Sequence, residues 1–134
     1  MWSFLLFRFI NGVDMVFSES LKKSQDFHKV YEEGFSLADP FLVMYVLENH
    51  SQMNRLGISV SKKVGNSVIR HHLTRLIREA YRLHEEMFGT GLDIVVVVRN
   101  RAKKSSYFQI EKSLLHLADL HKITVQTERK DSSC

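Results

Sequence analysis

The stretch that decides the fold runs from Asn54 to Arg82 and reads NRLGISVSKKVGNSVIRHHLTRLIREAYR. Over 55–61, apolar residues alternate with small or polar ones, which predicts a strand with one buried face. Gly65 ends this pattern. The Asn-Ser pair after it offers short polar side chains that can accept the first amide hydrogen bonds of a helix. We therefore predict a strand over 55–61 and a helix over 66–87, joined by a short turn.

The predicted helix has an apolar face and a basic face. At about 100° per residue, the apolar side chains fall on one side and predict contact with the core: Ile69, Leu73, Leu76, Ile77 and Ala80. On the opposite side, basic residues recur at steps of four, three and four: His71, Arg75, Arg78 and Arg82. Arg70 flanks this ridge, and Lys62 and Lys63 lie just before the helix.

Positive charge is concentrated in this stretch. It contains seven Lys or Arg against one acid, Glu79, whereas the whole chain has a net charge of +4. The stretch alone therefore carries +6, and the rest of the chain sums to −2. An ordinary solvated helix face is the alternative, but such faces mix acids with bases, and like charges at these spacings repel. The clustering favours a surface that binds a polyanion.

The size and composition of the chain indicate one domain. With 134 residues and 44% hydrophobic content, it can bury a single core. The single cysteine, Cys134, cannot form an intramolecular disulfide, so a reducing, cytoplasmic location is expected. Residues 1–17 are apolar, but Arg8 interrupts them and they fall short of the roughly 20 apolar residues of a membrane span. The position of Arg8, after the apolar run, also disfavours a signal peptide.

The run GISVSKKVGNSVIR, from Gly57 to Arg70, resembles the signature of the bacterial ribonuclease P protein subunit. In that family, a strand ending in Lys-Lys leads into a helix that carries Arg-Asn-Arg-x-x-Lys-Arg-x-x-Arg-Glu. The positions that agree with it are Arg70, Arg75, Arg78 and Glu79. The departures are His71 for Asn, His72 for a basic residue and Thr74 for Lys. LKKSQDFHKVYEEG and FLVMYVL also resemble family segments, so the resemblance covers roughly residues 20–122.

The resemblance divides the chain into three parts. Residues 1–17 are expected to be an extension outside the family pattern, and residues 1–14 an artefact of start-site choice. Residues 18–123 are expected to form one RNA-binding α/β domain, and 124–134 a polar, disordered tail.

The remaining elements are predicted from capping residues and periodicity. We expect a helix over 20–34, a short strand or loop over 35–39, strands over 41–47 and 93–98, and a last helix capped by Ser105. Its apolar side is expected to contain Phe108, Ile110, Leu114, Leu115, Leu117 and Leu120. The order is αββαβα. The resemblance implies a two-layer α/β (α+β) sandwich like that of some ribosomal proteins, with a mixed, mostly antiparallel sheet of about four strands. It also implies a left-handed crossover at the basic helix, against the usual rule.

No set of residues predicts catalysis or metal binding by the protein. The adjacent His71 and His72 point about 100° apart on a helix, and the seven histidines include no HExxH motif or Cys/His pair with zinc spacing. The candidate acids lie in different predicted elements without a recognisable motif. In the resembled family the catalytic component is an RNA, which also holds the Mg²⁺. The expectation is therefore no catalytic residue, no metal site and no cofactor bound by the protein alone.

A second candidate surface combines aromatic rings with a cation. Lys23, Phe27 and Tyr31 lie at successive turns of the first predicted helix, and Tyr45 lies in the following strand. Spacing alone is compatible with a core role for the rings or with stacking on single-stranded RNA. The resemblance implies that these four residues form a cleft for the 5′ leader of precursor tRNA.

The resemblance implies the protein subunit of ribonuclease P, which removes the 5′ leader of precursor tRNA by Mg²⁺-dependent hydrolysis. Its expected partners are the catalytic RNA and the leader, with no membrane and no protein partner. The residues expected to face the catalytic RNA are Arg55, Lys62, Lys63, Asn66, Arg70, His71, His72, Arg75, Arg78 and Arg82. A structural RNA-binding protein of ribosomal type is the first alternative. A DNA-binding regulator is the second, although a strand precedes the basic helix where a helix-turn-helix protein has a helix.

Overall fold

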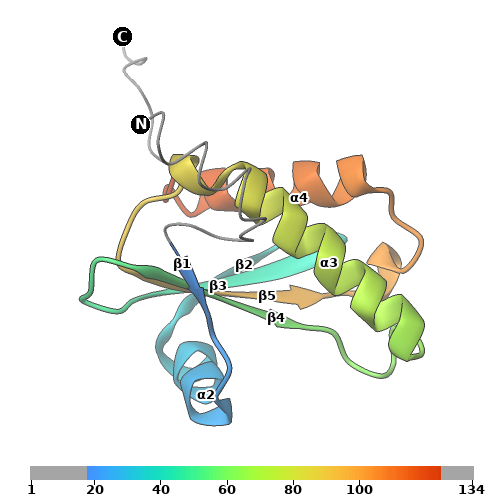
Figure 1. The fold of residues 1–134 in the computed structure, drawn as a ribbon, viewed down its shortest axis with the longest axis horizontal. Coiled ribbons are helices and arrows are strands. Elements are labelled where there is room, and N and C mark those ends of the chain that lie inside the picture. Colours follow the sequence, from blue (N-terminus) through green and yellow to red (C-terminus); the bar gives the residue numbers. More distant parts are fainter. Residues whose placement is uncertain (1–17, 125–134) are drawn as a thin grey trace, which may run out of the picture.

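The computed structural model describes residues 18–124, so the expected extension and most of the expected tail lie outside the described residues. A five-stranded sheet has the strand order β1-β4-β5-β3-β2. Helices α3 and α4 cover one face, and α2 lies against the other (Figure 1). The elements are β1 (Ser18–Ser20), α2 (Ser24–Glu33), β2 (Phe35–Ala38), β3 (Leu42–Glu48), β4 (Asn54–Ser59), α3 (Ser67–Leu83), β5 (Leu92–Val98) and α4 (Tyr107–Leu120), with 3₁₀ turns η1 (Glu85–Met87) and η2 (Asn100–Ala102).

The mixed α+β class is confirmed, but the sheet has one strand more than the four or so expected. The segment 35–39, expected to be a short strand or loop, contains the strand β2, which pairs antiparallel with β3. The additional strand is β1, whose sequence, Ser-Glu-Ser, has no apolar alternation to indicate it. It pairs parallel with β4 through Ser18 and Asn54. The first helix consequently starts at Ser24 rather than near residue 20.

The central strand is β5. It pairs parallel with β4 and antiparallel with β3. Its β-branched run is buried on both faces, as predicted, because Ile94 and Val96 pack toward α3 and α4 while Val95 packs toward α2.

Helix α3 connects the parallel neighbours β4 and β5. Figure 1 shows both strands running to the right, with α3 returning to the left above them and β5 lying behind β4. This connection is left-handed, as the resemblance implied and contrary to the usual hand of such crossovers. It places α3 on the same side of the sheet as α4.

The larger core cluster lies between the sheet and the pair α3 and α4. From α3, Leu73, Ile77 and Ala80 are fully buried, as the periodicity predicted, and Tyr81 is also buried. From α4, the buried residues recur at helical spacing: Ile110, Leu114, Leu117 and Ala118. Full burial of one such large apolar side chain contributes about 1.5–3 kcal/mol. These contacts bind α3 to the sheet despite the repulsion among its cations.

Two residues assigned to the apolar side of the last helix are in fact exposed. Phe108 is 74% exposed and Leu120 is 49% exposed. The buried face of α4 is centred on Ile110 and Leu114, and Phe108 lies about 200° around the helix from Ile110.

The helix ends follow the predicted chemistry with small shifts. The Asn66 side chain caps α3 by accepting a hydrogen bond from the Ile69 N–H at 3.0 Å. Ser106, not Ser105, caps α4. Helix α3 ends at Leu83, short of the predicted residue 87, because the chain tightens into η1. Beyond α4, Thr124 forms a β-bridge with Phe88.

The second, smaller cluster holds α2 against the sheet through Leu21, Val30 and Val95, with Phe27 partly buried beside them. Phe27 lies over Gly57 of β4. A Cβ atom at position 57 would lie only 2.7 Å from the Phe27 ring, so this close approach requires glycine.

Tyr81→Phe tests a buried polar contact of the larger core. The Tyr81 hydroxyl lies 2.7 Å from Ser18 Oγ and accepts a bond from Asn54 Nδ2 at 3.3 Å, which links α3 to β1 and β4. Burial raises the pKa of Tyr81 and keeps it neutral. We expect the substitution to lower the free energy of unfolding by about 1–2 kcal/mol in urea titrations. Tyr107→Phe, at a half-buried position, should cost less, and an equal loss in both would contradict this role.

Candidate nucleic-acid interface

The outward side of α3 and the turn before it carry exposed cations and histidines. This basic face consists of Lys62, Lys63, His71, His72 and Arg75, all exposed. Within residues 18–124, none of these side chains pairs with an acid. Their charges and hydrogen-bond donors are therefore available to an anionic partner.

The other arginines of the predicted ridge make contacts within the protein. Arg78 donates to Ser20 Oγ of β1 at 3.0 Å, and Arg82 pairs with Glu79 at 2.6 Å. Arg70 donates from Nε to the Gly65 carbonyl at 3.2 Å. These three arginines are therefore engaged within the protein, and the bond of Arg78 links α3 to β1.

Two further residues lie beside the basic face: Asn66, which the sequence analysis assigned to it, and Val68, which the sequence analysis did not use. Asn66 lies at the start of α3, where its side-chain oxygen caps the helix. Val68 is 75% exposed on the first turn, one helical turn before His71 and His72. An apolar side chain at this position can pack on a ribose or a base between phosphate contacts.

The opposite face of the sheet brings together three of the four residues assigned to the leader cleft. The ring centroids of Phe27 and Tyr31 lie 6.3 Å apart, and those of Tyr31 and Tyr45 lie 5.0 Å apart with an edge-on geometry. Tyr31 is 36% exposed, and the other two rings are half-buried. The rings form a packed group that is partly exposed, so it is neither wholly core nor wholly surface.

A groove runs beside this aromatic group. It has a volume of about 350 Å³ and is lined by Lys22, Ser24, Phe27, His28, Tyr31, Ile58 and Ser59. Lys23 is exposed at the start of α2, and its neighbour Lys22 lines the groove. We call these rings and this groove the aromatic groove.

Sequence reasoning missed a second basic cluster that follows β5. Its exposed members are Arg99, Arg101, Lys103 and Lys104. Because β4 and β5 are parallel, the segments that follow them, Lys62–Lys63 and this cluster, leave the sheet at the same edge. Four cations within six residues, RNRAKK, were the sequence signal.

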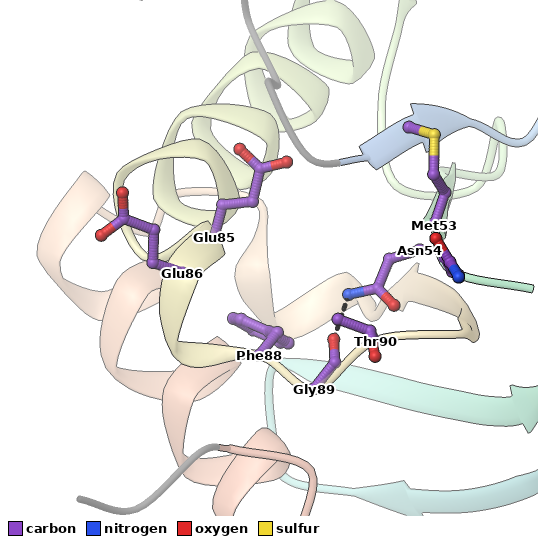
Figure 2. A pocket seen from close by; sticks show the side chains of 8 residues that line it. Met53, Asn54, Glu85, Glu86, Phe88, Gly89 and Thr90 are labelled. Atoms are coloured by element: carbon purple, nitrogen blue, oxygen red, sulfur yellow. Dashed lines mark hydrogen bonds between the residues drawn. The ribbon is translucent and has the colours of Figure 1, made fainter. Parts of the chain in front are cut away.

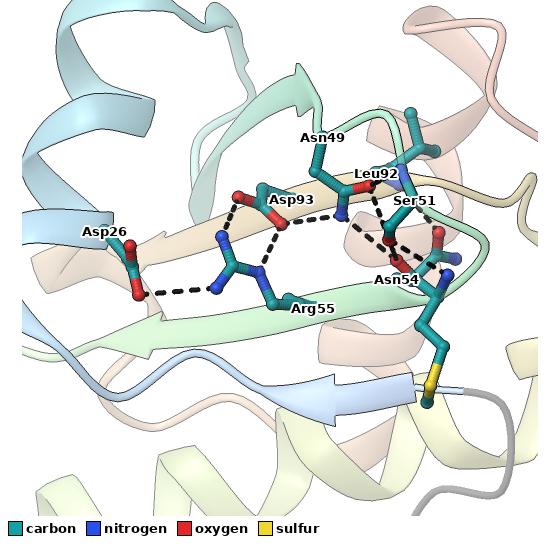
Figure 3. Close-up of polar contacts among 8 residues, drawn as sticks. Asp26, Asn49, Ser51, Asn54, Arg55, Leu92 and Asp93 are labelled. Atoms are coloured by element: carbon teal, nitrogen blue, oxygen red, sulfur yellow. Dashed lines mark hydrogen bonds and ion pairs between the residues drawn. The ribbon is translucent and has the colours of Figure 1, made fainter.

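Arg55, which the sequence predicts to face the catalytic RNA with the basic helix, lies on the face of the sheet that carries α2. Figure 3 shows its guanidinium between two carboxylates. Nε and Nη2 donate to the two oxygens of Asp93 at 2.8 and 2.7 Å, and Nη1 lies 3.3 Å from Asp26 of α2. The structure therefore does not bring Arg55 together with the basic face.

The buried Asp93 is the centre of this network. Burial alone raises the pKa of Asp93, but hydrogen bonds from Arg55 and Asn49 outweigh it and hold the pKa below the ordinary 3.8. The bond to Asp93 in turn raises the pKa of Arg55. Asp93 is therefore ionised and paired in the folded protein near neutral pH.

A separate hollow lies at the start of β4 and has different chemistry (Figure 2). It measures about 450 Å³ and is lined by Gln52, Met53, Asn54, Glu85, Glu86, Phe88, Gly89 and Thr90. Its charged lining residues are both acidic, which disfavours a phosphate ligand.

Neither a cluster of metal ligands nor a membrane-spanning helix occurs among the described residues. Between Ser18 and Thr124, no three or more His, Cys, Asp or Glu side chains are grouped as metal ligands. No helix in this part of the chain has the length and apolar content to cross a membrane.

The ribonuclease P family model matches residues 15–122. The chain belongs to this family. It is 57% identical over 111 residues to the ribonuclease P protein component of Lachnoclostridium phytofermentans, covering 83% of this chain and 96% of the relative. It is 44% identical to that of Clostridioides difficile, covering 81% and 96%.

Solved ribonuclease P proteins share the fold. The Staphylococcus aureus protein superposes with a TM-score of 0.74 at 38% identity, covering 79% of this chain and 97% of the other. The Thermotoga maritima protein gives 0.71 at 30% identity, covering 75% and 96%. Family membership assigns the chain to ribonuclease P, the endoribonuclease of tRNA 5′-end maturation, and implies an RNA partner. Nothing in these comparisons supports a protein of ribosomal type.

Asp93→Asn should lower stability in a pH-dependent way. The folded-state pKa of Asp93 is depressed, so its contribution is present above the ordinary value of 3.8 and is lost as pH falls through the folded-state pKa. We expect the variant to be less stable than the wild type at pH 7, by about 1.5–3 kcal/mol for the charged hydrogen bonds. Urea titrations at pH 7, 5 and 3 should show this difference narrowing at the lowest pH. A difference that is constant across the series would show that the charge of Asp93 is not involved.

Proposed function

We propose that this chain binds the catalytic RNA of ribonuclease P through the basic face of α3. The observation that carries the proposal is the exposed basic face, whose cations and histidines pair with no acid among residues 18–124, while the other side of α3 is buried in the core. Lysine and arginine side chains in such an arrangement bind phosphates with little dependence on sequence. Arg70, Arg78 and Arg82 flank this face and extend it while keeping their contacts within the protein.

The aromatic groove on the other side of the sheet holds the single-stranded 5′ leader of precursor tRNA. Phe27 and Tyr31 line the groove beside the exposed Lys22 and Lys23. Single-stranded RNA is bound in this way, by stacking of bases on aromatic rings beside cations. The two RNA partners thus bind to opposite faces of one sheet.

The chemical step belongs to the RNA partner. The residues of the two surfaces bind and position RNA, and they include no paired acid and base at hydrogen-bond distance aimed at a common point. Mg²⁺ held by the catalytic RNA supplies the activation of water and the charge stabilisation for hydrolysis. The protein increases the fraction of catalytic RNA that has precursor tRNA bound, and it holds the leader in place relative to the catalytic RNA.

Reconstitution with a bacterial ribonuclease P RNA tests this function. Added protein should stimulate correctly placed 5′ cleavage of precursor tRNA at low Mg²⁺. Arg75→Ala removes an exposed cation that pairs with no acid among residues 18–124, so it should weaken binding to the catalytic RNA. The slope of log affinity against log salt concentration should fall by roughly the contribution of one phosphate contact. Lys112→Ala, an exposed cation of α4, is the matched control and should leave both unchanged. Absence of stimulation by the wild-type protein would contradict the proposed function.

Phe27→Leu tests the leader site. Leucine keeps most of the apolar volume over Gly57 but removes the stacking surface, so the protein should still fold. The variant holoenzyme should bind precursor tRNA less tightly by about 1–3 kcal/mol if a base stacks on this ring. Its affinities for mature tRNA and for the catalytic RNA should hardly change. Equal losses for all three ligands would show that Phe27 acts only in the core.

A further inference from the structure

Arg55 connects three elements that meet beside the aromatic groove. It lies on β4, directly paired in register with Asp93 of β5, and it reaches Asp26 in the first turn of α2. The Asp93 side chain is only 4% exposed, whereas those of Arg55 and Asp26 are 32% and 28% exposed. Asn49 donates a further bond to Asp93 at 2.9 Å. The guanidinium is therefore fixed at its buried end, and Nη1 faces the helix (Figure 3).

The contact with Asp26 lies next to the residues of the groove. Asp26 directly precedes Phe27 in α2, and Tyr31 follows one turn later. On β4, Arg55 and Gly57 point to the same face, and the Phe27 ring lies on Gly57. The other contacts of α2 with the sheet are apolar and aromatic: Val30 is buried against it, and the Phe27 ring lies on Gly57. The ion pair of Arg55 with Asp26 adds a directional polar contact to these.

We propose that Arg55 and Asp26 are positioning residues that set the place of α2 on the sheet and so hold Phe27 and Tyr31 in the geometry that accepts the leader. The inference rests on the proposed function of the aromatic groove. It gives Arg55 a role other than the direct RNA contact expected from its charge. Asp93 acts as the anchor that orients the guanidinium toward α2.

A direct contact of Arg55 with the leader and a positioning role of Arg55 predict opposite effects on leader binding when the Asp26 carboxylate is removed. If Arg55 bound a leader phosphate directly, Asp26 would compete with the RNA for the guanidinium, and removing this acid would strengthen leader binding. If Arg55 positions α2 through Asp26, removing the acid loosens the helix and weakens leader binding. Because Asp26 is an acid near an RNA site, simple electrostatics cannot produce a loss of affinity when it is removed.

The test uses the reconstituted holoenzyme and the ratio of its affinities for precursor tRNA with a leader and for mature tRNA. Asp26→Ala should lower this ratio by about threefold or more, a difference well within binding assays. Asp26→Glu, which keeps a carboxylate within reach of Nη1, should restore most of it. Glu32→Ala removes an exposed acid elsewhere on α2 and should not lower the ratio. The salt dependence of precursor binding should not change in Asp26→Ala, since no phosphate contact is lost.

Affinity for the catalytic RNA, measured on the same preparations, reports whether each variant is folded. If Asp26→Ala fails this control, Asp26→Asn serves in its place. Suppose that the wild-type holoenzyme binds precursor tRNA more tightly than mature tRNA. An unchanged or increased ratio of these two affinities in the folded Asp26 variant then overturns this inference alone. A wild-type holoenzyme that does not distinguish the two tRNAs overturns the leader site and this inference with it.

Discussion

The parallel pairing of β4 with β5 is the constraint on which the rest of the structure depends. Parallel neighbours cannot be joined by a tight turn, so the chain between them must cross one face of the sheet, and α3 makes this crossing. Since β5 is buried on both faces, each face requires a helical cover. Helices α3 and α4 cover one face through the larger core, and α2 covers part of the other.

This arrangement separates two surfaces of different chemistry. The basic face lies on the solvent side of α3, and the aromatic groove lies beyond the sheet, next to α2. The sheet and its core lie between the two surfaces, so an RNA bound to one surface does not cover the other. The segments after β4 and β5 bring further cations to the edge between the two surfaces.

Much of the fold follows from the sequence because the periodic signals are strong. The alternation in β4, the β-branched run of β5 and the stripe of Leu73, Ile77 and Ala80 each predict the correct element. Strand β1 has three residues and no apolar alternation, so only its pairing with β4 reveals it. Phe108 was placed on the buried side because hydrophobicity alone does not give the phase of α4 against its neighbours.

In the candidate site, too, local sequence patterns predict which residues share a helix face but not which tertiary contacts they make. Local spacing identified the exposed His71, His72 and Arg75, because these lie on one helix and share its geometry. The sequence also shows the charge of Arg55, but its partners Asp26 and Asp93 are 29 and 38 residues away in the chain. Only the folded sheet shows that this cation is already paired. Charge counts therefore predict a polyanion-binding chain, while the role of each cation depends on its tertiary contacts.

The central claim is that opposite faces of the sheet bind different RNAs, and site-specific photo-cross-linking within the holoenzyme tests it most directly. A cross-linker at Val68, 75% exposed on α3, should attach to the catalytic RNA. One at the exposed His28, which lines the aromatic groove, should attach to the leader of precursor tRNA. Cross-links from both positions to the same RNA, or with the two targets exchanged, would contradict the account.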